Sequence, residues 1–164
     1  MTGSRELAVE ALTASAFALF GEVVEAGAAP ESINEGTARR YADLATIELE
    51  GGRPRVSLYR AEARSLPLAI TMLERHPLGS QLFMPLSPEP FMVVVAPAAP
   101  VPDRSAVRAF LTNGRQGVNY RRGTWHHPLI APRAGEFLVL DRGGPGANCD
   151  EFRFTGGGFL LRLP

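Results

Sequence analysis

The residues that decide the fold stand near the middle of the chain: Glu74-Arg75-His76-Pro77-Leu78-Gly79-Ser80-Gln81-Leu82-Phe83. Proline and glycine favour turn conformations, so Pro77-Leu78-Gly79 predicts a tight turn between two short strands. Successive side chains of a strand point to opposite faces, so Glu74 and His76 share one face and Gln81 returns beside them. The stretch therefore predicts two neighbouring strands with polar side chains gathered on one face.

Short segments with strand character continue on both sides of this stretch. Glycine and proline contribute 17 and 14 of the 164 residues, which favours many turns and short strands. Many short strands with few helices between them predict an all-β sandwich or barrel. The expected strands are 22–25, 44–49, 55–61, 68–74, 81–86, 91–96, 117–120, 136–141, 151–154 and 159–163.

One or two short helices are expected among these strands. Segment 12–21 offers Thr13 as a cap and Gly21 as a stop, and segment 102–114 begins with capping residues and ends at Asn113-Gly114. The polar segment 30–41 predicts a loop. The chain contains no internal repeat and no linker, so we expect residues 1–164 to form a single domain.

Composition excludes several classes of function. The 17 basic residues balance 17 acidic ones, which argues against nucleic acid or an anionic membrane as a partner. Every basic residue is arginine, so lysine-dependent chemistry such as Schiff-base formation is impossible. Cys149 is the only cysteine, which excludes an intrachain disulfide and a multi-cysteine zinc site. A single cysteine, with no signal peptide or membrane-spanning stretch in the sequence, predicts a cytoplasmic protein.

A second histidine segment, Gly123-Thr124-Trp125-His126-His127-Pro128, complements the first. Glu-x-His-x4-Gln at 74–81 and Gly-x-x-His at 123–126 resemble the two metal-ligand motifs of the cupins, which are jelly-roll β-barrels with a small-ligand site at the mouth. Neighbouring residues of a strand face opposite ways, so only one of His126 and His127 should point inward, and the motif favours His126. A metal held by Glu74, His76, Gln81 and His126 is a weaker alternative, because glutamine binds transition metals poorly.

The chain more closely resembles the ureidoglycolate lyase family of allantoin catabolism. Four stretches carry the resemblance: INEGTARRYADL at 33–44, ERHPLGSQLFMPL at 74–86, RAFLTNGRQGVNYRRGTWHHPL at 108–129, and LDRGG at 140–144 followed by NCD at 148–150. The resemblance implies a cupin-like barrel, a homodimer, a divalent metal such as nickel, and the cleavage of ureidoglycolate into glyoxylate and urea in purine nitrogen catabolism. Many members have histidine where this chain has Ala42, which leaves the true substrate open.

This chemistry suggests a role for each candidate residue. Eliminating urea requires a base for the hydroxyl proton and an acid for the departing nitrogen, and His126, with His76 or Glu74 as its complement, is the candidate pair. A guanidinium group suits the substrate carboxylate, and Arg75, Arg40 and Arg122 are the candidates. Arg75 alternates with His76 along the strand, so an outward-pointing Arg75 would leave Arg40 as the competitor, and the choice among the three stays open. Gln81, Asn119 and Tyr120 are expected to line the pocket, where the amides of Gln81 and Asn119 can bind the urea group.

Two other classes of function remain open. The protein could be a non-catalytic cupin that binds a small carboxylate, or another cupin enzyme, such as a metal-dependent oxygenase or isomerase, acting on a related acid. Segment 91–95 is apolar on both faces, which predicts a core strand or part of a subunit interface. Cys149 stands beside acidic residues that disfavour a thiolate, so it is expected to be non-catalytic.

Overall fold

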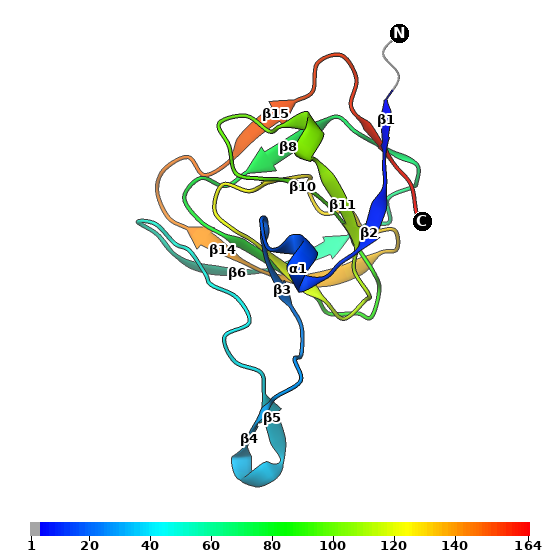
Figure 1. Ribbon diagram of the computed structural model, residues 1–164. Coiled ribbons are helices and arrows are strands. Elements are labelled where there is room, and N and C mark those ends of the chain that lie inside the picture. Colours follow the sequence, from blue (N-terminus) through cyan, green and yellow to red (C-terminus); the bar gives the residue numbers. More distant parts are fainter. Residues whose placement is uncertain (1–3) are drawn as a thin grey trace.

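Strands form most of the regular structure in the computed structural model, which describes residues 4–164 (Figure 1). The six-stranded sheet contains, in spatial order, β15 (Asp150–Arg153), β8 (Met72–Arg75), β13 (Trp125–His126), β10 (Met92–Ala96), β11 (Arg108–Leu111) and β2 (Val9–Ala11). The five-stranded sheet contains β3 (Gly21–Val24), β12 (Gly117–Tyr120), β9 (Gln81–Pro85), β14 (Gly135–Gly143) and β6 (Arg53–Ala61). Smaller sheets are formed by β1 (Arg5–Leu7), β16 (Phe159–Leu161) and β7 (Leu68–Ile70), and by β4 (Glu31–Ile33) with β5 (Ala38–Arg40). The all-β, cupin-like expectation is confirmed.

Two hydrophobic cores hold these sheets together. The first lies between the five-stranded and six-stranded sheets and is rich in aromatic rings, and the second lies between the six-stranded sheet and β1-β16-β7. Strand β10 serves both, since Val93 and Val95 face the first core while Met92 and Val94 face the second. Of the two expectations for segment 91–95, the core strand is therefore the one observed.

The expectation of a helix over 102–114 is wrong. A short 3-10 turn covers Arg104–Ala106, and β11 follows it. Ala109 lies in the second core and Phe110 in the first, so burying both neighbours requires the two-faced geometry of a strand. Packing between two cores overrides the local helix signals.

The loop expected over 30–41 is also wrong, because β4 and β5 form a hairpin there, with a 3-10 turn at Asn34–Gly36. Segment 44–49 forms no strand beyond a single bridge between Leu49 and Gly79, and segment 68–74 divides into β7 and β8, which belong to different sheets. Strands β1 and β2 were missed.

The helix expected over 12–21 exists in a shorter form. Helix α1 covers Ala14–Phe17, and the Thr13 hydroxyl accepts a hydrogen bond from the Ala16 amide, as its capping role predicts. Within residues 4–164, no helix is long and apolar enough to cross a membrane.

Candidate functional site

The two histidine segments meet between the two large sheets. His126 in β13 pairs directly with Glu74 in β8, and the His126 and His76 rings lie 5.1 Å apart. Glu74 Oε1 lies 3.9 Å from His126 Nδ1 and 4.0 Å from His76 Nε2. The end of β8 and its pairing with β13 thus bring one carboxylate and two imidazoles together.

His76 is held by acceptors at both ring nitrogens. Nδ1 lies 2.7 Å from the Asn148 carbonyl oxygen, which can only accept, and Nε2 lies 3.2 Å from Gln81 Oε1. Gln81 Nε2 donates a long hydrogen bond of 3.5 Å to Asp141 Oδ2, which orients the amide so that its oxygen faces His76. These contacts fix the orientation of the His76 ring beside Glu74.

His126 is sealed from solvent, with 1% of its surface exposed. Tyr120 stacks on its ring at a centroid distance of 4.2 Å and an interplanar angle of 4°. Among residues 4–164, Nε2 has no hydrogen-bond partner. Burial, followed by repulsion from His76, lowers the pKa of His126 to about 3, so the ring is neutral. His127 turns the other way, and its Nδ1 donates to the Pro128 carbonyl oxygen at 2.8 Å. Only His126 faces the site, as expected.

Glu74 differs from an ordinary surface carboxylate. Burial raises its pKa, and the nearby Glu151 adds to this effect, while His76 opposes it. Cys149 Sγ lies 3.9 Å from Glu74 Oε2, and burial with its acidic neighbours raises the pKa of this thiol. Glu74 therefore binds a proton more readily than an exposed carboxylate, and the raised pKa of Cys149 disfavours its thiolate.

A polar pocket of about 280 Å³ opens beside this cluster. Arg55 and Asp141 face each other across β6 and β14 in a two-pronged ion pair, with Nε–Oδ1 and Nη2–Oδ2 distances of 2.8 and 2.9 Å. About half of the Arg55 side chain stays exposed, so its remaining N–H donors can reach a ligand. The pocket is lined by Arg55, His76, Asp141, Arg142, Gly144, Gly146, Asn148 and Cys149.

The three arginines proposed from the sequence lie elsewhere. Arg75 points away from Glu74 and His76, pairs with Asp150 and stacks over Trp125. Arg40 pairs with Glu31 in the β4–β5 hairpin, and Arg122 pairs with Glu50. None of the three lines the polar pocket.

Of the other proposed pocket residues, two face the site and one does not. Gln81 and Tyr120 contact His76 and His126, as described above. Asn119 lies on the opposite face of β12, where its amide donates to Glu22 Oε2 and to the Thr46 carbonyl oxygen, each at 2.9 Å. Asn119 therefore fastens segment 44–49 to the outside of the sheet.

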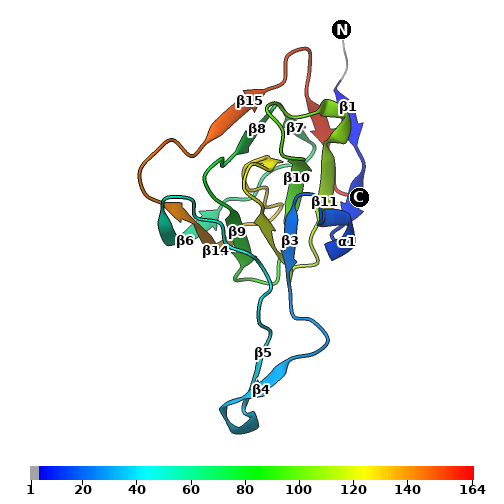
Figure 2. The ribbon, with the colours of Figure 1, turned by 60° about the vertical axis from the view of Figure 1, so that its left-hand side comes forward.

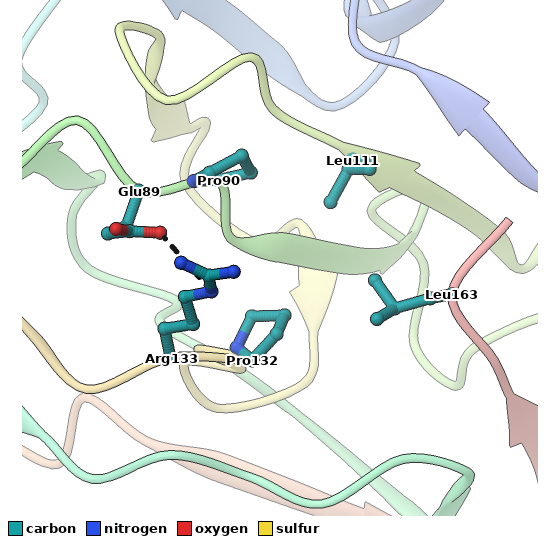
Figure 3. A pocket seen from close by; sticks show the side chains of 6 residues that line it. All are labelled: Glu89, Pro90, Leu111, Pro132, Arg133 and Leu163. Carbon is teal, nitrogen blue, oxygen red and sulfur yellow. Dashed lines mark ion pairs between the residues drawn. The ribbon is translucent and has the colours of Figure 1, made fainter.

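Another pocket, of about 320 Å³, lies away from this chemistry (Figure 3). Prolines and leucines form most of its wall, and its two charged residues, Glu89 and Arg133, pair with each other at 3.7 Å. It offers no acid–base cluster, so we place the functional site at Glu74, His76 and His126.

The chain is similar to proteins of one known family. The model of the family described as ureidoglycolate lyase matches residues 4–160. The chain belongs to the ureidoglycolate lyase family. A relative named ureidoglycolate lyase from Burkholderia mallei (strain NCTC 10229) is 55% identical over 151 residues, covering 90% of this chain and 88% of its own. One of the same name from Pseudomonas aeruginosa (strain LESB58) is 54% identical over 164 residues, covering 98% and 97%. A third, from Pseudomonas fluorescens (strain Pf0-1), is 49% identical, covering 98% of each chain.

In this member of the ureidoglycolate lyase family, the cluster also fits a metal ion. One ligand atom from each of Glu74, His76 and His126 lies within 4.8 Å of the others. Two imidazoles and a carboxylate form a donor set that suits divalent nickel, zinc or iron. Gln81 was the fourth ligand considered from the sequence, but its Oε1 lies within hydrogen-bond distance of His76 Nε2.

Sequence reasoning missed Arg55, Asp141 and Asn148 as site residues. Asp141 and Asn148 stand within the stretches that carry the resemblance to the ureidoglycolate lyase family, which was the available signal. The sequence signal for Arg55 was weaker. Arg55 is a polar residue at the start of an expected strand whose following side chains alternate between two faces. Its partner Asp141 is 86 positions away, so only the sheet pairing reveals the contact.

Proposed function

We propose that this protein is a ureidoglycolate lyase, which eliminates urea from ureidoglycolate to give glyoxylate in purine nitrogen catabolism. The observation that carries the proposal is the carboxylate of Glu74 set between two imidazoles beside an arginine-lined pocket. Family membership and relatives that bear this name support it.

The reaction needs one proton acceptor and one proton donor. The central carbon of ureidoglycolate carries a hydroxyl, a carboxylate and a urea nitrogen. A base removes the hydroxyl proton, the oxygen forms the aldehyde C=O bond, and the C–N bond breaks with its electron pair going to nitrogen. An acid protonates that nitrogen, so urea leaves and the proton count balances. Each such group typically accelerates a reaction by ~10²–10⁴-fold.

Glu74 is the base and His76 the acid in this proposal. From the sequence, His126 was the candidate base or acid, but a ring whose burial lowers its pKa to about 3 accepts protons poorly. Glu74 has a raised pKa, and His76, whose ring is fixed by contacts at both nitrogens, lies beside it as the proton donor. Glu74 Oε1 lies 4.0 Å from His76 Nε2, so the proton that Glu74 takes up can return to His76 after each turnover. His126 then acts on Glu74, as a neutral positioning residue.

Arg55 binds the substrate carboxylate in this proposal. Asp141 uses two of its N–H donors and fixes the plane of the guanidinium, which leaves the outer donors for a second, planar acid. Gln81 lies between Asp141 and His76 and is the candidate partner for the urea amide. The residue proposed to bind the substrate carboxylate, Arg55, and the residue proposed to bind the urea group, Gln81, thus both lie near His76, the proposed acid.

A bound divalent metal would be held by Glu74, His76 and His126. It would supply Lewis-acid polarisation of the substrate oxygens. We also propose, as the sequence resemblance implies, that the protein is a homodimer and that it works in the cytoplasm, which the single exposed cysteine supports.

The test is release of urea and glyoxylate from ureidoglycolate, with each product measured separately. The proposal predicts equal amounts of both, with turnover by the wild type. If glyoxylate raises the melting temperature but ureidoglycolate yields neither product, the protein is the small-carboxylate binder and the proposal fails.

A further inference from the structure

Tyr59, which has no part in the proposed reaction, lies on the same face of β6 as Arg55. Tyr59 pairs with Phe137 and Arg55 pairs with Asp141 across β14, and residues that alternate along a strand share a face. Phe137 belongs to the first core, so this is the inner face of the sheet. Tyr59 and Arg55 are roughly 13 Å apart along the strand. Both side chains therefore face the space between the two large sheets.

The Tyr59 ring leans across this face towards β9. Strands β6, β14 and β9 lie side by side in that order (Figure 2), so the backbones of β6 and β9 are roughly 10 Å apart. The Tyr59 ring nevertheless meets the Phe83 ring edge-on, with a centroid separation of 5.7 Å. Val139, which pairs with Phe83 on the strand between them, is small enough to let the phenol cross. Gln81 shares this face of β9, so the phenol reaches the strand that carries the proposed urea ligand.

The hydroxyl of Tyr59 is open to a ligand. Tyr59 is 37% exposed, whereas Tyr120, the other tyrosine on the inner face of this sheet, is 5% exposed. Both carboxylate oxygens of Asp141 accept hydrogen bonds from Arg55 or Gln81, and none of these bonds involves Tyr59. The phenol O–H therefore remains for a substrate.

The charged groups of the site act on this phenol. Burial, and then the negative charge of Asp141, raises the pKa of Tyr59, with Glu74 adding to the effect and Arg55 opposing it. Glu74 stands on the opposite sheet, so the phenol lies between groups from both sheets. A phenol with a raised pKa keeps its proton at neutral pH and serves as a hydrogen-bond donor.

We propose that the Tyr59 hydroxyl donates a hydrogen bond to the carbonyl oxygen of the substrate's urea group, an inference that rests on the proposed function and extends it. Gln81 turns its amide oxygen to His76 and its nitrogen to Asp141, so it suits the N–H groups of urea better than the carbonyl oxygen. A donor for that oxygen is therefore still needed, and Tyr59 is the donor that reaches β9.

This contact would strengthen as the reaction proceeds. When the C–N bond breaks, its electron pair goes to the urea nitrogen and is shared with the adjoining carbonyl oxygen. The Tyr59 hydroxyl stabilises that charge without giving up its proton, and His76 supplies the proton that the nitrogen gains. A hydrogen bond that is stronger in the transition state than in the bound substrate raises kcat.

The test is Tyr59→Phe in the full chain, which keeps the ring on Phe83 and removes only the hydroxyl. Two probes separate the ends of the substrate by calorimetry: ureidoacetate carries the urea group and the carboxylate but no hydroxyl, so it cannot eliminate urea, and glyoxylate carries the carboxylate alone. We expect the variant to bind ureidoacetate about three- to tenfold more weakly, the value of one hydrogen bond, and glyoxylate within about twofold of the wild type. With ureidoglycolate, kcat should fall at least about tenfold.

Arg60→Met is the matched control, since it changes the next side chain of β6, which pairs with Glu136 on the outer face. It should alter neither dissociation constant nor kcat. The melting temperature of Tyr59→Phe should equal that of the wild type, which shows that the variant folds.

Three results would overturn the role of Tyr59: a wild type that does not bind ureidoacetate, equal affinity of wild type and Tyr59→Phe for it, or equal weakening of ureidoacetate and glyoxylate. The binding measurements do not depend on turnover. If the wild type releases no urea, the proposed reaction fails, while weaker binding of ureidoacetate to Tyr59→Phe would still support the contact with the urea group. If the wild type turns over and Tyr59→Phe has the same kcat, the reaction stands and the transition-state contact of Tyr59 fails.

Discussion

At the scale of single residues, the site depends on Glu74, His76 and His126, which lie in one cluster but have different surroundings. His126 is neutral because it is buried, Glu74 holds its proton more tightly than usual, and His76 meets acceptors on both sides. Surroundings that separate the pKa values of neighbouring groups allow one residue to act as an acid and another as a base.

The pKa of His126 predicts how stability depends on pH. The folded-state pKa is lowered to about 3 from 6.5, so the unfolded chain binds more protons between these values, and stability falls as the pH drops through this window. Between about pH 6.5 and about pH 5, the free energy of unfolding falls by about 2 kcal/mol. The raised pKa of Glu74 acts in the opposite sense, since its stabilising protonated form is lost as the pH rises above 4.5.

Comparison with His126→Phe isolates the histidine contribution. Phenylalanine keeps an aromatic ring under Tyr120 but does not titrate, so the melting temperature of the variant should fall less steeply with acid than that of the wild type. Parallel curves for the two proteins would mean that His126 is not held neutral.

Arg55 carries the second prediction at this scale. Arg55→Met removes the proposed carboxylate ligand and should raise KM for ureidoglycolate by about 10- to 100-fold, the value of a hydrogen bond to a charged group. Arg60→Met is the matched control, since Arg60 stands on the outer face of the same strand and pairs with Glu136. An unchanged KM in Arg55→Met, or an equal loss in both variants, would contradict the assignment.

At the scale of elements, strand alternation explains which arginine reaches the site. Arg75 lies between Glu74 and His76 in sequence, and for that reason it faces the other way, over Trp125. Arg55 reaches the pocket because β6 pairs with β14 in a register that sets Arg55 opposite Asp141. Local pattern predicts the face of a residue, but only the long-range register predicts its neighbours.

The same reasoning applies to β11, and it can be tested by stability. Phe110 is fully buried and packs edge-on against Phe17, so Phe110→Ala should cost about 3–5 kcal/mol of unfolding free energy in denaturant titration. Val101→Ala, at an exposed position nearby in the sequence, should change it by less than about 0.5 kcal/mol. A loss below about 1 kcal/mol for Phe110→Ala would show that β11 does not separate the two cores.

At the scale of the whole molecule, the site exists because two sheets contribute to it. Glu74 and His126 come from the six-stranded sheet, and Gln81, Asp141 and Arg55 come from the five-stranded one. The sequence predicted the all-β class, most strands and the meeting of the two histidine segments, because alternation and turn residues are local signals. It did not predict β1, β2 or β11, since parallel pairing and burial between two cores depend on distant partners. It predicted a loop where the β4–β5 hairpin lies, because that segment is polar.

Metal binding depends on the whole fold, because strands distant in the sequence bring the three candidate ligands together. Saturating nickel(II) should raise the melting temperature of the wild type by about 5–10 °C, because an ion that binds only the folded state stabilises it. A chelator should reverse the shift, and His76→Asn should abolish it. Equal shifts in wild type and variant would place the ion elsewhere.

The most direct test of the account is the turnover number of Glu74→Gln, measured as urea released from ureidoglycolate, beside Glu136→Gln as an exposed control on β14. Removal of the base predicts a fall of at least about 100-fold in kcat for Glu74→Gln and less than about twofold for the control. A Glu74→Gln enzyme that releases urea within about twofold of the wild-type rate would contradict it.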